Sequence, residues 1–393
     1  MSENIVIVSY ARTPLGSFKG ALSSVPATKL GATAIKGALD KISFDYDYVD
    51  EVIMGCVLPA GLGQAPARQA AIYADLPKSV ETLTINKMCG SGLKAIMQAS
   101  QSIICKNSEV VIAGGMENMS KSPHYLLNSR NGIKFGNSDL VDSMIKDGLL
   151  DAYSNELMGH CAELCAKKYG FSRSEQDDFA QRSYLRSQKA INEGHFEKEI
   201  VPVNISKRKG ESMVINQDEE PQNVNFDKMK SLRPAFKNSG TITAGNASTI
   251  NDGAAAVLMM SERRATSLGL KPIAKIISQA SFAHEPEWFT TAPVSAMKKA
   301  LEKAELTIDE IDLFEINEAF SVVTMAAEKD LKLNPEKVNI FGGAVSMGHP
   351  IGASGARIMC TLLNAMEYVD ANRGMASICI GGGEASAVIV ERV

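Results

Sequence analysis

The feature that most constrains the fold of this 393-residue chain is an internal duplication of strand, loop and helix units. The segment 307–316, TIDEIDLFEI, repeats the pattern of acidic and apolar residues found in 46–54, YDYVDEVIM. The segment 376–384, ASICIGGGE, likewise repeats the pattern of 110–117, VVIAGGME. Strands that alternate with helical segments in this way predict an α/β domain with a largely parallel sheet. We therefore expect two similar α/β halves.

A long polar segment separates the two halves. Residues 120–251 are rich in Asn, Ser, Lys and Glu and are interrupted by Gly and Pro, which favours an insertion of binding loops over a third sheet. One amphipathic helix is expected at 174–194, behind a capping-box pattern formed by Ser172 and Glu175. The predicted organisation is an N-terminal half at 1–119 plus 252–271, a loop insertion at 120–251 and a C-terminal half at 272–393.

The bulk composition limits the classes of partner. A net charge of −4 gives no case for a nucleic-acid or membrane surface, and no apolar run approaches the length of a membrane span. An anionic ligand must then meet a local basic patch, for which Lys207, Arg208 and Lys228 are candidates. Seven unpatterned cysteines suit a reducing compartment, and no targeting segment precedes the strand expected at 4–8. We expect a cytoplasmic protein.

Cys89 occupies the most informative local position. A β-type segment at 81–88, expected to be buried, runs into CGSG at 89–92, and apolar residues then recur at helical spacing. A thiol at the start of a helix meets free N–H groups and the positive end of the helix dipole, which favours a thiolate nucleophile. A small buried cysteine of the core is the alternative, and this stretch alone leaves both open.

The duplication places Cys89, His349 and Cys379 at equivalent strand-to-loop junctions, which should face one shared site. His349 lies between a glycine and a proline, in a turn that we expect to be exposed. Cys379 precedes three glycines, whose bare N–H groups allow close approach of a substrate. Asn317 follows the strand expected at 313–316, and its alternative role is that of a helix N-cap.

Five segments of the chain resemble the signatures of the thiolase family. They are NKMCGSG at 86–92, GGMENMS at 114–120, NEAF at 317–320, GGAVSMGHPIG at 342–352 and CIGGGE at 379–384. The resemblance covers essentially the whole chain, with the motifs in family order. It is greatest to the acetoacetyl-CoA thiolases (acetyl-CoA acetyltransferases), and among these to the mitochondrial, potassium-activated branch. It implies the thiolase fold, with two duplicated α/β halves packed in layers (αβαβα) and a long loop-domain insertion.

The resemblance also implies an acyltransferase of lipid metabolism. The reaction would condense two acetyl-CoA to acetoacetyl-CoA plus CoA, reversibly by thiolysis, through an acetyl-cysteine intermediate. Cys89 would be acylated with His349 accepting its proton, and Cys379 would remove the α-proton of the second acetyl-CoA. One oxyanion hole would use His349 and a water held by Asn317, and the other the N–H groups of Cys89 and Gly381. No metal or redox cofactor would be required.

The family's coenzyme A positions can be carried over residue by residue. The pantetheine positions correspond to Met158, Phe236, Ser248, Ala319 and Phe320, and the nucleotide positions to Tyr184, Asn223, Val224, Asn225 and Lys228. The chain departs from the family at Asn223 and Asn225, where close relatives carry Arg and Asp. The potassium positions correspond to Tyr184, Ala244, Gly245, Ala247 and Val345, mostly through backbone carbonyls.

Three rival functions can be weighed from the same residues. A degradative 3-ketoacyl-CoA thiolase of broader chain length shares the catalytic apparatus, although Phe289 at the acyl end argues for short acyl groups. A decarboxylating ketoacyl synthase would use a Cys-His-His set, which Cys379 argues against. A non-catalytic thiolase-like carrier fits poorly with retention of all the catalytic positions. A homodimer or homotetramer is expected, with apolar residues of 121–140 available for a second interface.

Overall fold

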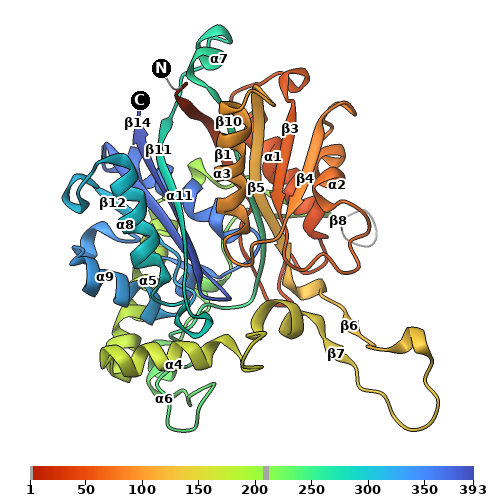
Figure 1. Ribbon diagram of the computed structural model, residues 1–393, viewed down its shortest axis with the longest axis vertical. Coiled ribbons are helices and arrows are strands. Elements are labelled where there is room, and N and C mark those ends of the chain that lie inside the picture. The colour runs from red at the N-terminus through yellow and green to blue at the C-terminus, as the bar shows by residue number, and fades with distance from the viewer. Residues whose placement is uncertain (1–2, 207–211) are drawn as a thin grey trace.

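The computed structural model describes residues 3–206 and 212–393 (Figure 1). Within these ranges the main sheet has the strand order β12-β13-β14-β11-β1-β10-β5-β3-β4, with β2 paired to β10. Its strands are β1 (Ile5–Arg12), β2 (Gly16–Ser17), β3 (Glu51–Gly55), β4 (Glu81–Ile85), β5 (Val110–Asn118), β10 (Asn251–Ser261), β11 (Ala274–Ala283), β12 (Leu313–Ile316), β13 (Arg373–Ile380) and β14 (Glu384–Arg392).

The strands and helices form five layers, as the resemblance implied. Helices α1 (Ala27–Asp40) and α2 (Pro66–Tyr73) cover the outer face of the N-terminal strands. Helices α3 (Ser91–Ile104) and α11 (Ser354–Tyr368) lie between the two sets of strands. Helices α8 (Ala292–Ala304) and α9 (Ser321–Leu331) cover the C-terminal strands on the other side, and α7 (Glu262–Ser267) and α10 (Ala344–Met347) are short connectors.

The prediction of a largely parallel sheet was wrong. Only the pairs β3–β4, β3–β5 and β12–β13 are parallel within the described sheet, and the remaining pairs are antiparallel. In each half the last strand returns beside the strand before it, as β14 does beside β13 through a three-glycine turn, and such a return forces antiparallel pairing. The two halves join where β1 pairs with β11, at Val6 with Lys275 and Ile7 with Ala274.

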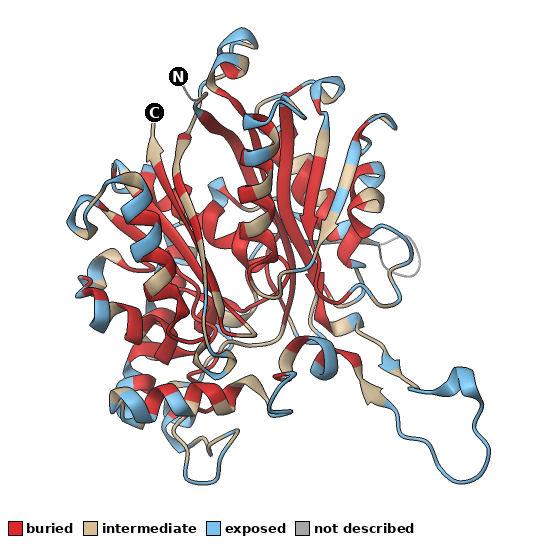
Figure 2. Cartoon of the chain, viewed as in Figure 1, coloured by how far each residue is buried: buried red, intermediate tan, exposed pale blue. Residues whose placement is uncertain are grey.

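The two central helices touch through glycines. A Cβ at Gly355 would lie 2.2 Å from the Leu93 nitrogen, and one at Gly92 would lie 2.6 Å from the Ala356 nitrogen. Because these positions lack side chains, the N-terminal ends of α3 and α11 approach to backbone contact. Residues 354–366 of α11 are all buried (Figure 2), so its polar stripe of Ser354, Arg357, Thr361 and Asn364 faces the protein interior and not water. The contact brings the turn before α3 next to the turn before α11.

Strand β5 runs to Asn118, because its whole length is paired with β10. One strand differs from its predicted character. The strand before Cys89 was expected to be buried, but β4 is an edge strand whose residues are all at least partly exposed. Burial there depends on which strand ends the sheet, and local sequence does not encode that.

The insertion lies between β5 and β10. The corresponding strands of the C-terminal half, β13 and β14, are joined only by the three-glycine turn. Its described elements are β6 (His124–Tyr125), β7 (Val141–Asp142), α4 (Met158–Tyr169), α5 (Arg173–Asn192), β8 (Val203–Ser206), β9 (Ser212–Ile215) and α6 (Phe226–Ser231). Helix α5 confirms the predicted amphipathic helix, and Ser172 and Glu175 form the predicted capping box. Lys207 and Arg208, proposed as basic partners of a ligand, lie outside the described residues.

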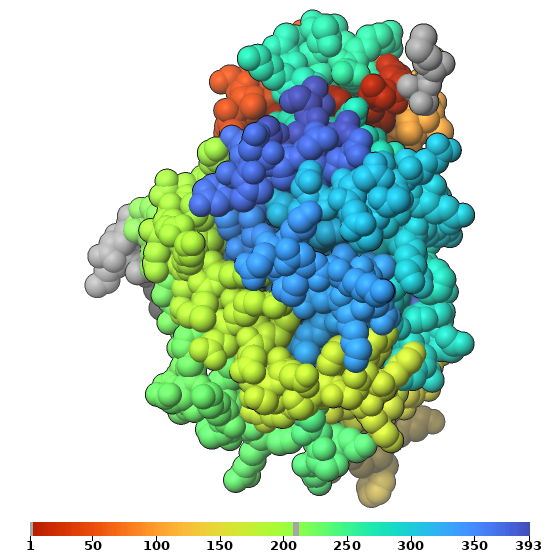
Figure 3. All heavy atoms as spheres, turned by 90° about the vertical axis from the view of Figure 1, so that its left-hand side faces the viewer, coloured from red at the N-terminus to blue at the C-terminus, as the bar shows by residue number. Residues whose placement is uncertain are grey.

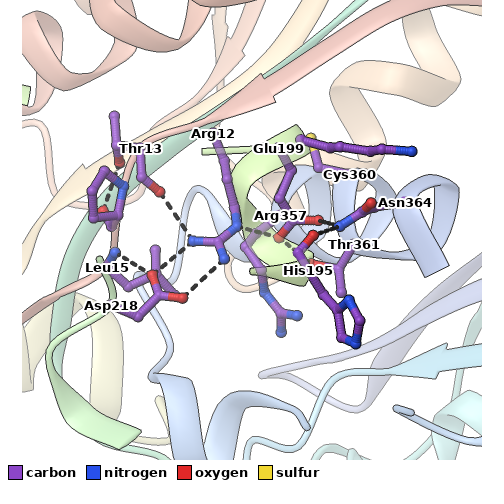
Figure 4. A network of polar contacts seen from close by, with 12 residues as sticks. Arg12, Thr13, Leu15, His195, Glu199, Asp218, Arg357, Cys360, Thr361 and Asn364 are labelled. Carbon is purple, nitrogen blue, oxygen red and sulfur yellow. Dashed lines mark hydrogen bonds and ion pairs between the residues drawn. The ribbon is translucent and has the colours of Figure 1, made fainter. Parts of the chain in front are cut away.

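A buried ion network fastens the insertion to β1 (Figure 4). The Arg12 guanidinium donates to Glu199 Oε1 at 2.5 Å and to both oxygens of Asp218 at 2.7 and 2.9 Å. Glu199 also accepts from Thr361 and Asn364 of α11. Loss of one partner of such a buried set typically costs about 3–5 kcal/mol, because it leaves an uncompensated charge. Consistent with this anchoring, Figure 3 shows the insertion lying against the C-terminal half.

Residues 121–140 extend away from the body, beyond the short β6–β7 pair (Figures 1 and 2). The side chains of Leu127, Ile133 and Phe135 are exposed there, as the sequence predicted for a segment with nothing to bury them. Tyr125 is half-buried and donates its hydroxyl to Asp147 at 2.7 Å. None of the described helices combines the length and apolarity that crossing a membrane requires.

Candidate active site

A cavity of about 570 Å³ opens where the turns before α3 and α11 meet the insertion. Cys89, His349 and Gly381 all line it, so the structure brings these predicted residues together. Most of the remaining wall is apolar and comes from the insertion. The wall includes Met119, Met144, Leu149, Leu157, Met158, Phe236, Ala247, Ser248, Phe289, Ala319 and Phe320.

Cys89 sits on a tight turn between β4 and α3. Met88 has a φ of +45°, a left-handed conformation that L side chains rarely adopt. The turn is held by Ser91, whose Oγ accepts from the Lys87 N–H at 2.8 Å and donates to the Met88 carbonyl at 2.6 Å. A Cβ at Gly90 would lie 2.4 Å from Ile380, so the turn packs directly on the end of β13. The sulfur is thereby held at the cavity wall.

The expectation of a thiol pKa lowered by the helix terminus was wrong. Burial raises the pKa of Cys89 to about 11, although the backbone N–H groups of Gly381 and of Cys89 itself act to lower it. Desolvation of the thiolate outweighs the helix-terminus effect, because the sulfur faces an apolar cavity. Cys89 therefore rests as a thiol and needs a base to become a nucleophile.

The His349 turn is buried, which corrects the prediction of an exposed turn. The residue is 6% exposed, and its backbone N–H donates to Asn251 Oδ1 at 3.0 Å. Its Nδ1 lies 2.5 Å from Ser354 Oγ, and that hydroxyl donates to the Pro350 carbonyl at 2.9 Å. Since the hydroxyl hydrogen is engaged with the carbonyl, Ser354 accepts from His349 and the imidazole proton sits on Nδ1.

The other nitrogen of His349 is then free to accept a proton. Nε2 is buried and has no hydrogen-bond partner among the described residues. Burial, together with the nearby positive charge of Arg357, lowers the pKa of His349 to about 3, so the ring is neutral at ordinary pH. A neutral imidazole that lines the cavity through its unprotonated nitrogen has the form of a general base.

Asn317 lies behind the imidazole. It is fully buried, with Nδ2 at 3.5 Å from His349 Nδ1 and Oδ1 at 3.5 Å from the Arg357 guanidinium. At 3.5 Å the contact with His349 is too long to determine the tautomer, unlike the short contact with Ser354. The alternative role as an N-cap is wrong, because α9 begins at Ser321 and Phe320 takes that position.

Cys379 is the penultimate residue of β13 and is fully buried in an apolar cluster that includes Phe289 and Phe320. Burial raises its pKa well above the usual value, and the nearby Cys89 thiolate would raise it further. The equivalence predicted between the Cys89 and Cys379 junctions was wrong. Cys89 follows β4, whereas β13 is the counterpart of β5, and the two thiols are neighbours because α3 begins against the end of β13.

Sequence reasoning missed a buried carboxylate that joins the two halves. Glu117 at the end of β5 accepts from the N–H groups of Val57 at 2.9 Å, Leu58 at 3.1 Å and Gly352 at 2.9 Å. Gly352 follows His349 by three residues, and Leu58 packs with Ile351 at the cavity wall. Burial raises the pKa of Glu117 to about 7. An acidic residue inside a strand of apolar and small residues was the available signal.

Family models decide the classification. The thiolase N-terminal domain matches residues 5–263, and the thiolase C-terminal domain matches residues 270–392. The chain belongs to the thiolase family. An acetyl-CoA acetyltransferase of Schizosaccharomyces pombe is 50% identical over the full length of both chains. A relative from Gibberella zeae named as a cytosolic acetyl-CoA acetyltransferase is 49% identical, covering 99% of this chain and 98% of its own.

The solved structures agree with this classification. The Acat5 thiolase of Ascaris suum, in complex with coenzyme A, superposes with a TM-score of 0.94 at 44% identity, and each chain is covered completely. The thiolase fold predicted from the motifs is thus confirmed.

The positions that the resemblance predicts for coenzyme A fall into two groups. The five predicted pantetheine positions, Met158, Phe236, Ser248, Ala319 and Phe320, all line the cavity. The nucleotide positions do not: Asn223 and Lys228 are exposed beyond it, and Asn225 caps α6 by accepting from the Lys228 N–H at 3.0 Å. Val224 and Tyr184 pack together in a small cluster beside α6.

The positions that the resemblance predicts for potassium lie in one neighbourhood. Ala244 and Ala247 line the cavity, while Tyr184 and Val345 pack with Met229, which a Cβ at Gly245 would approach to 3.0 Å. The pKa of the Tyr184 hydroxyl is raised by burial and then by the carboxylates Glu220 and Glu318. A buried hydroxyl with two carboxyl groups near it fits the side-chain part of a site for a monovalent cation.

Proposed function

We propose that this thiolase is an acetyl-CoA C-acetyltransferase that condenses two acetyl-CoA into acetoacetyl-CoA and CoA, with thiolysis as the reverse reaction. The observation that carries the proposal is the meeting of a thiol, a neutral imidazole and a backbone N–H at one wall of an apolar cavity, with a second thiol behind it. The names of the relatives support acetyl groups as the transferred unit.

In the first step, Cys89 Sγ attacks the thioester carbonyl of one acetyl-CoA while its proton passes to His349 Nε2. The raised pKa of Cys89 makes this transfer necessary, and the free lone pair of Nε2 makes it possible. The bond from the carbonyl carbon to the CoA sulfur breaks, and the departing sulfur takes the proton of Cys379. The products are acetyl-Cys89, free CoA and a Cys379 thiolate.

In the second step, the Cys379 thiolate removes the α-proton of the second acetyl-CoA. The resulting carbanion forms the new carbon–carbon bond at the acetyl carbonyl of Cys89, and the bond from that carbon to Cys89 Sγ breaks. The Cys89 thiolate then recovers its proton from His349, so both cysteines and the imidazole return to their starting forms. The high pKa of buried Cys379 suits this role, because a weakly acidic thiol gives a strong base.

Two sets of donors stabilise the oxyanions in this scheme. The N–H groups of Cys89 and Gly381, which already lower the pKa of the Cys89 thiol, face the acetyl group on that sulfur. His349, once protonated on Nε2, and a water held by Asn317 serve the second acetyl-CoA. One donor of this kind typically contributes about 3 kcal/mol to the transition state.

Coenzyme A would enter along the insertion. Its pantetheine arm would lie against Met158, Phe236, Ser248, Ala319 and Phe320. The Ascaris suum relative, whose structure is a complex with coenzyme A, supports coenzyme A as the ligand. The nucleotide would reach Tyr184, Asn223, Val224, Asn225 and Lys228. Of the basic residues named as candidates, Lys228 lies within the described part of the chain and could meet a phosphate. No redox or metal cofactor takes part in the chemistry.

A potassium ion would bind through Tyr184 and the carbonyls of Ala244, Gly245, Ala247 and Val345. Bound there, it would supply charge that orders the loop before Ser248 and, through Val345, the helix α10 that precedes His349.

The assembly and compartment follow the same proposal. The exposed apolar side chains of the segment 121–140 support a homodimer or homotetramer, since an isolated copy leaves them in water. The relative named as cytosolic supports a cytoplasmic enzyme of lipid metabolism.

The broader-chain degradative 3-ketoacyl-CoA thiolase is the alternative. Against it stands the acyl end of the cavity, where buried Phe289 meets Phe320 edge-on at 6.3 Å between ring centroids. Two aromatic rings in contact leave little room for a long acyl chain.

The test is acyl transfer followed by mass spectrometry. Incubation with acetyl-CoA should place an acetyl group on the peptide carrying Cys89, and acetoacetyl-CoA with CoA should be cleaved faster than longer ketoacyl-CoA substrates. A label on Cys379 with none on Cys89 would overturn the assignment of the nucleophile. Faster cleavage of long-chain substrates would favour the alternative.

A further inference from the structure

An ion pair joins the two active-site turns. The Lys87 ammonium contacts the Glu384 carboxylate, and both side chains are partly buried, at 25% and 35% exposure. Lys87 lies two residues before Cys89, and Glu384 lies three residues after Gly381. Neither residue lines the cavity, so neither is placed to touch the substrate.

The Gly381–Gly383 turn needs anchors because it consists of glycines alone. Gly382 and Gly383 have φ values of +93° and +87°, and glycine loses more conformational freedom on folding than any other residue. On the far side, the His284 N–H donates to the Gly383 carbonyl at 2.9 Å. On the near side, Ile380 packs on Gly90, and Glu384 reaches across to Lys87.

We propose that Lys87 and Glu384 form a positioning pair that holds the Gly381 N–H against the Cys89 sulfur. Two short backbone segments, from Lys87 to Cys89 and from Gly381 to Glu384, are thereby joined at both ends. The Gly381 N–H contacts the Cys89 sulfur at one end, and the ion pair joins Lys87 to Glu384 at the other. This inference rests on the proposed function, in which that N–H stabilises the oxyanion on acetyl-Cys89. Misplacement of a catalytic group by about 1 Å can cost on the order of 100-fold in rate.

Lys94, one turn into α3, is a further charge beside the pair, since both Lys87 and Glu384 act on its pKa. Its presence makes the charge-reversal variants unequal. E384K would place three positive charges together with no carboxylate between them. K87E would place two carboxylates together, and the positive charge of Lys94 would offset one of them. The double reversal, K87E/E384K, would restore an opposite-charge pair in the same place.

The experiment measures the burst rate of acetyl transfer to Cys89 in the variants K87M, E384Q, K87E, E384K and K87E/E384K. We expect K87M and E384Q each to lower this rate roughly tenfold with an unchanged KM for acetyl-CoA. E384K should be slower still, and the double reversal should recover to within roughly threefold of the parent. The matched control is K198E/E367K, a surface pair at 2.7 Å that is remote from the turns and should leave the rate unchanged.

A second measurement separates positioning from simple charge. Because the Gly381 N–H lowers the thiol pKa, loss of its position should slow alkylation of Cys89 by iodoacetamide at about pH 9 in both K87M and E384Q. A purely coulombic effect would move the two variants in opposite directions. Modified peptides identified by mass spectrometry distinguish Cys89 from the other thiols.

Parent-like burst rates in K87M and E384Q, opposite alkylation shifts, or a double reversal no faster than the slower single variant would each overturn the positioning role. Failure of the parent protein to transfer acetyl groups at all would instead refute the proposed function.

Discussion

Replacement of Ser354 by alanine tests the assignment of His349 as the base for Cys89. The Ser354 Oγ, 2.5 Å from Nδ1, is the acceptor that keeps the imidazole proton on that nitrogen. The nearest other side-chain group at Nδ1 is the Asn317 amide, a donor at 3.5 Å. Without the hydroxyl, a proton on Nδ1 has no acceptor, and the tautomer protonated on Nε2 becomes favoured. That tautomer cannot accept the Cys89 proton.

The size of the effect follows from the burial of the ring. In either tautomer the ring then holds a buried proton without a partner among the described residues, but only the tautomer protonated on Nε2 lets Nδ1 accept from the Asn317 amide. A buried polar group left without its partner costs about 1–3 kcal/mol, so the productive form becomes less populated by a similar free energy. Since about 1.4 kcal/mol corresponds to a tenfold change in rate, acylation should slow by roughly tenfold to a hundredfold.

The assay combines the burst of CoA release from acetyl-CoA with nitrogen NMR of labelled histidine. Because the pKa of His349 is about 3, the ring stays neutral across the working pH range, and the nitrogen shifts report the tautomer alone. Ser278→Ala is the matched control, since it removes a buried hydroxyl that donates to the Ala300 carbonyl at 2.6 Å, away from the site. Parent-like acylation by S354A, with the proton still on Nδ1, would refute the reasoning.

Four further predictions follow from the same geometry. Cys379→Ser should still give an acetylation burst at Cys89, because protonated His349 can supply the departing CoA sulfur with a proton in place of Cys379. Condensation should be at least about 100-fold slower, because a hydroxyl is too weak an acid to lose its proton and act as the base. Loss of the burst with condensation no more affected would contradict this division of roles. Folding raises the pKa of the Glu117 carboxyl from 4.5 to about 7, so the folded state holds this proton more tightly than the unfolded state does. As pH rises between those two values, this group therefore lowers the free energy of unfolding, by up to about 3 kcal/mol. Glu117→Gln removes that dependence, so its melting temperature relative to the parent should be higher at about pH 8 than at about pH 5; a constant difference would reject the shift. Thiolysis should be faster in potassium than in sodium at equal ionic strength, and Tyr184→Phe should reduce the difference, whereas equal parent activity in both salts would remove the ion. Light scattering at micromolar concentration should find a dimer or larger assembly, with Phe135→Asp depleting any tetramer, and a monomeric parent would contradict the interface.

The sequence by itself determined the elements and the chemical groups. Helix α5 lies behind the capping box of Ser172 and Glu175 as predicted, and the turn at Cys89 follows from glycines placed between a β-type segment and a helical one. These features depend on neighbours within a few residues, which a single sequence displays. The five motifs likewise predicted that Cys89, His349 and Gly381 share one site, and all three line the same cavity.

Only the tertiary structure decided the environment of those groups. Contacts between elements far apart in sequence determine three features that local patterns did not predict. These are the antiparallel pairing of most strands, the exposure of β4 and the burial of His349. The protonation states depend on the same packing: desolvation, which no local pattern encodes, keeps Cys89 a thiol and His349 neutral. The role of Glu117 belongs to this class, since its carboxylate binds Gly352 from the other half, 235 positions along the chain. Local sequence specifies which donors and acceptors exist, whereas the fold fixes which of them meet and how much water remains between them.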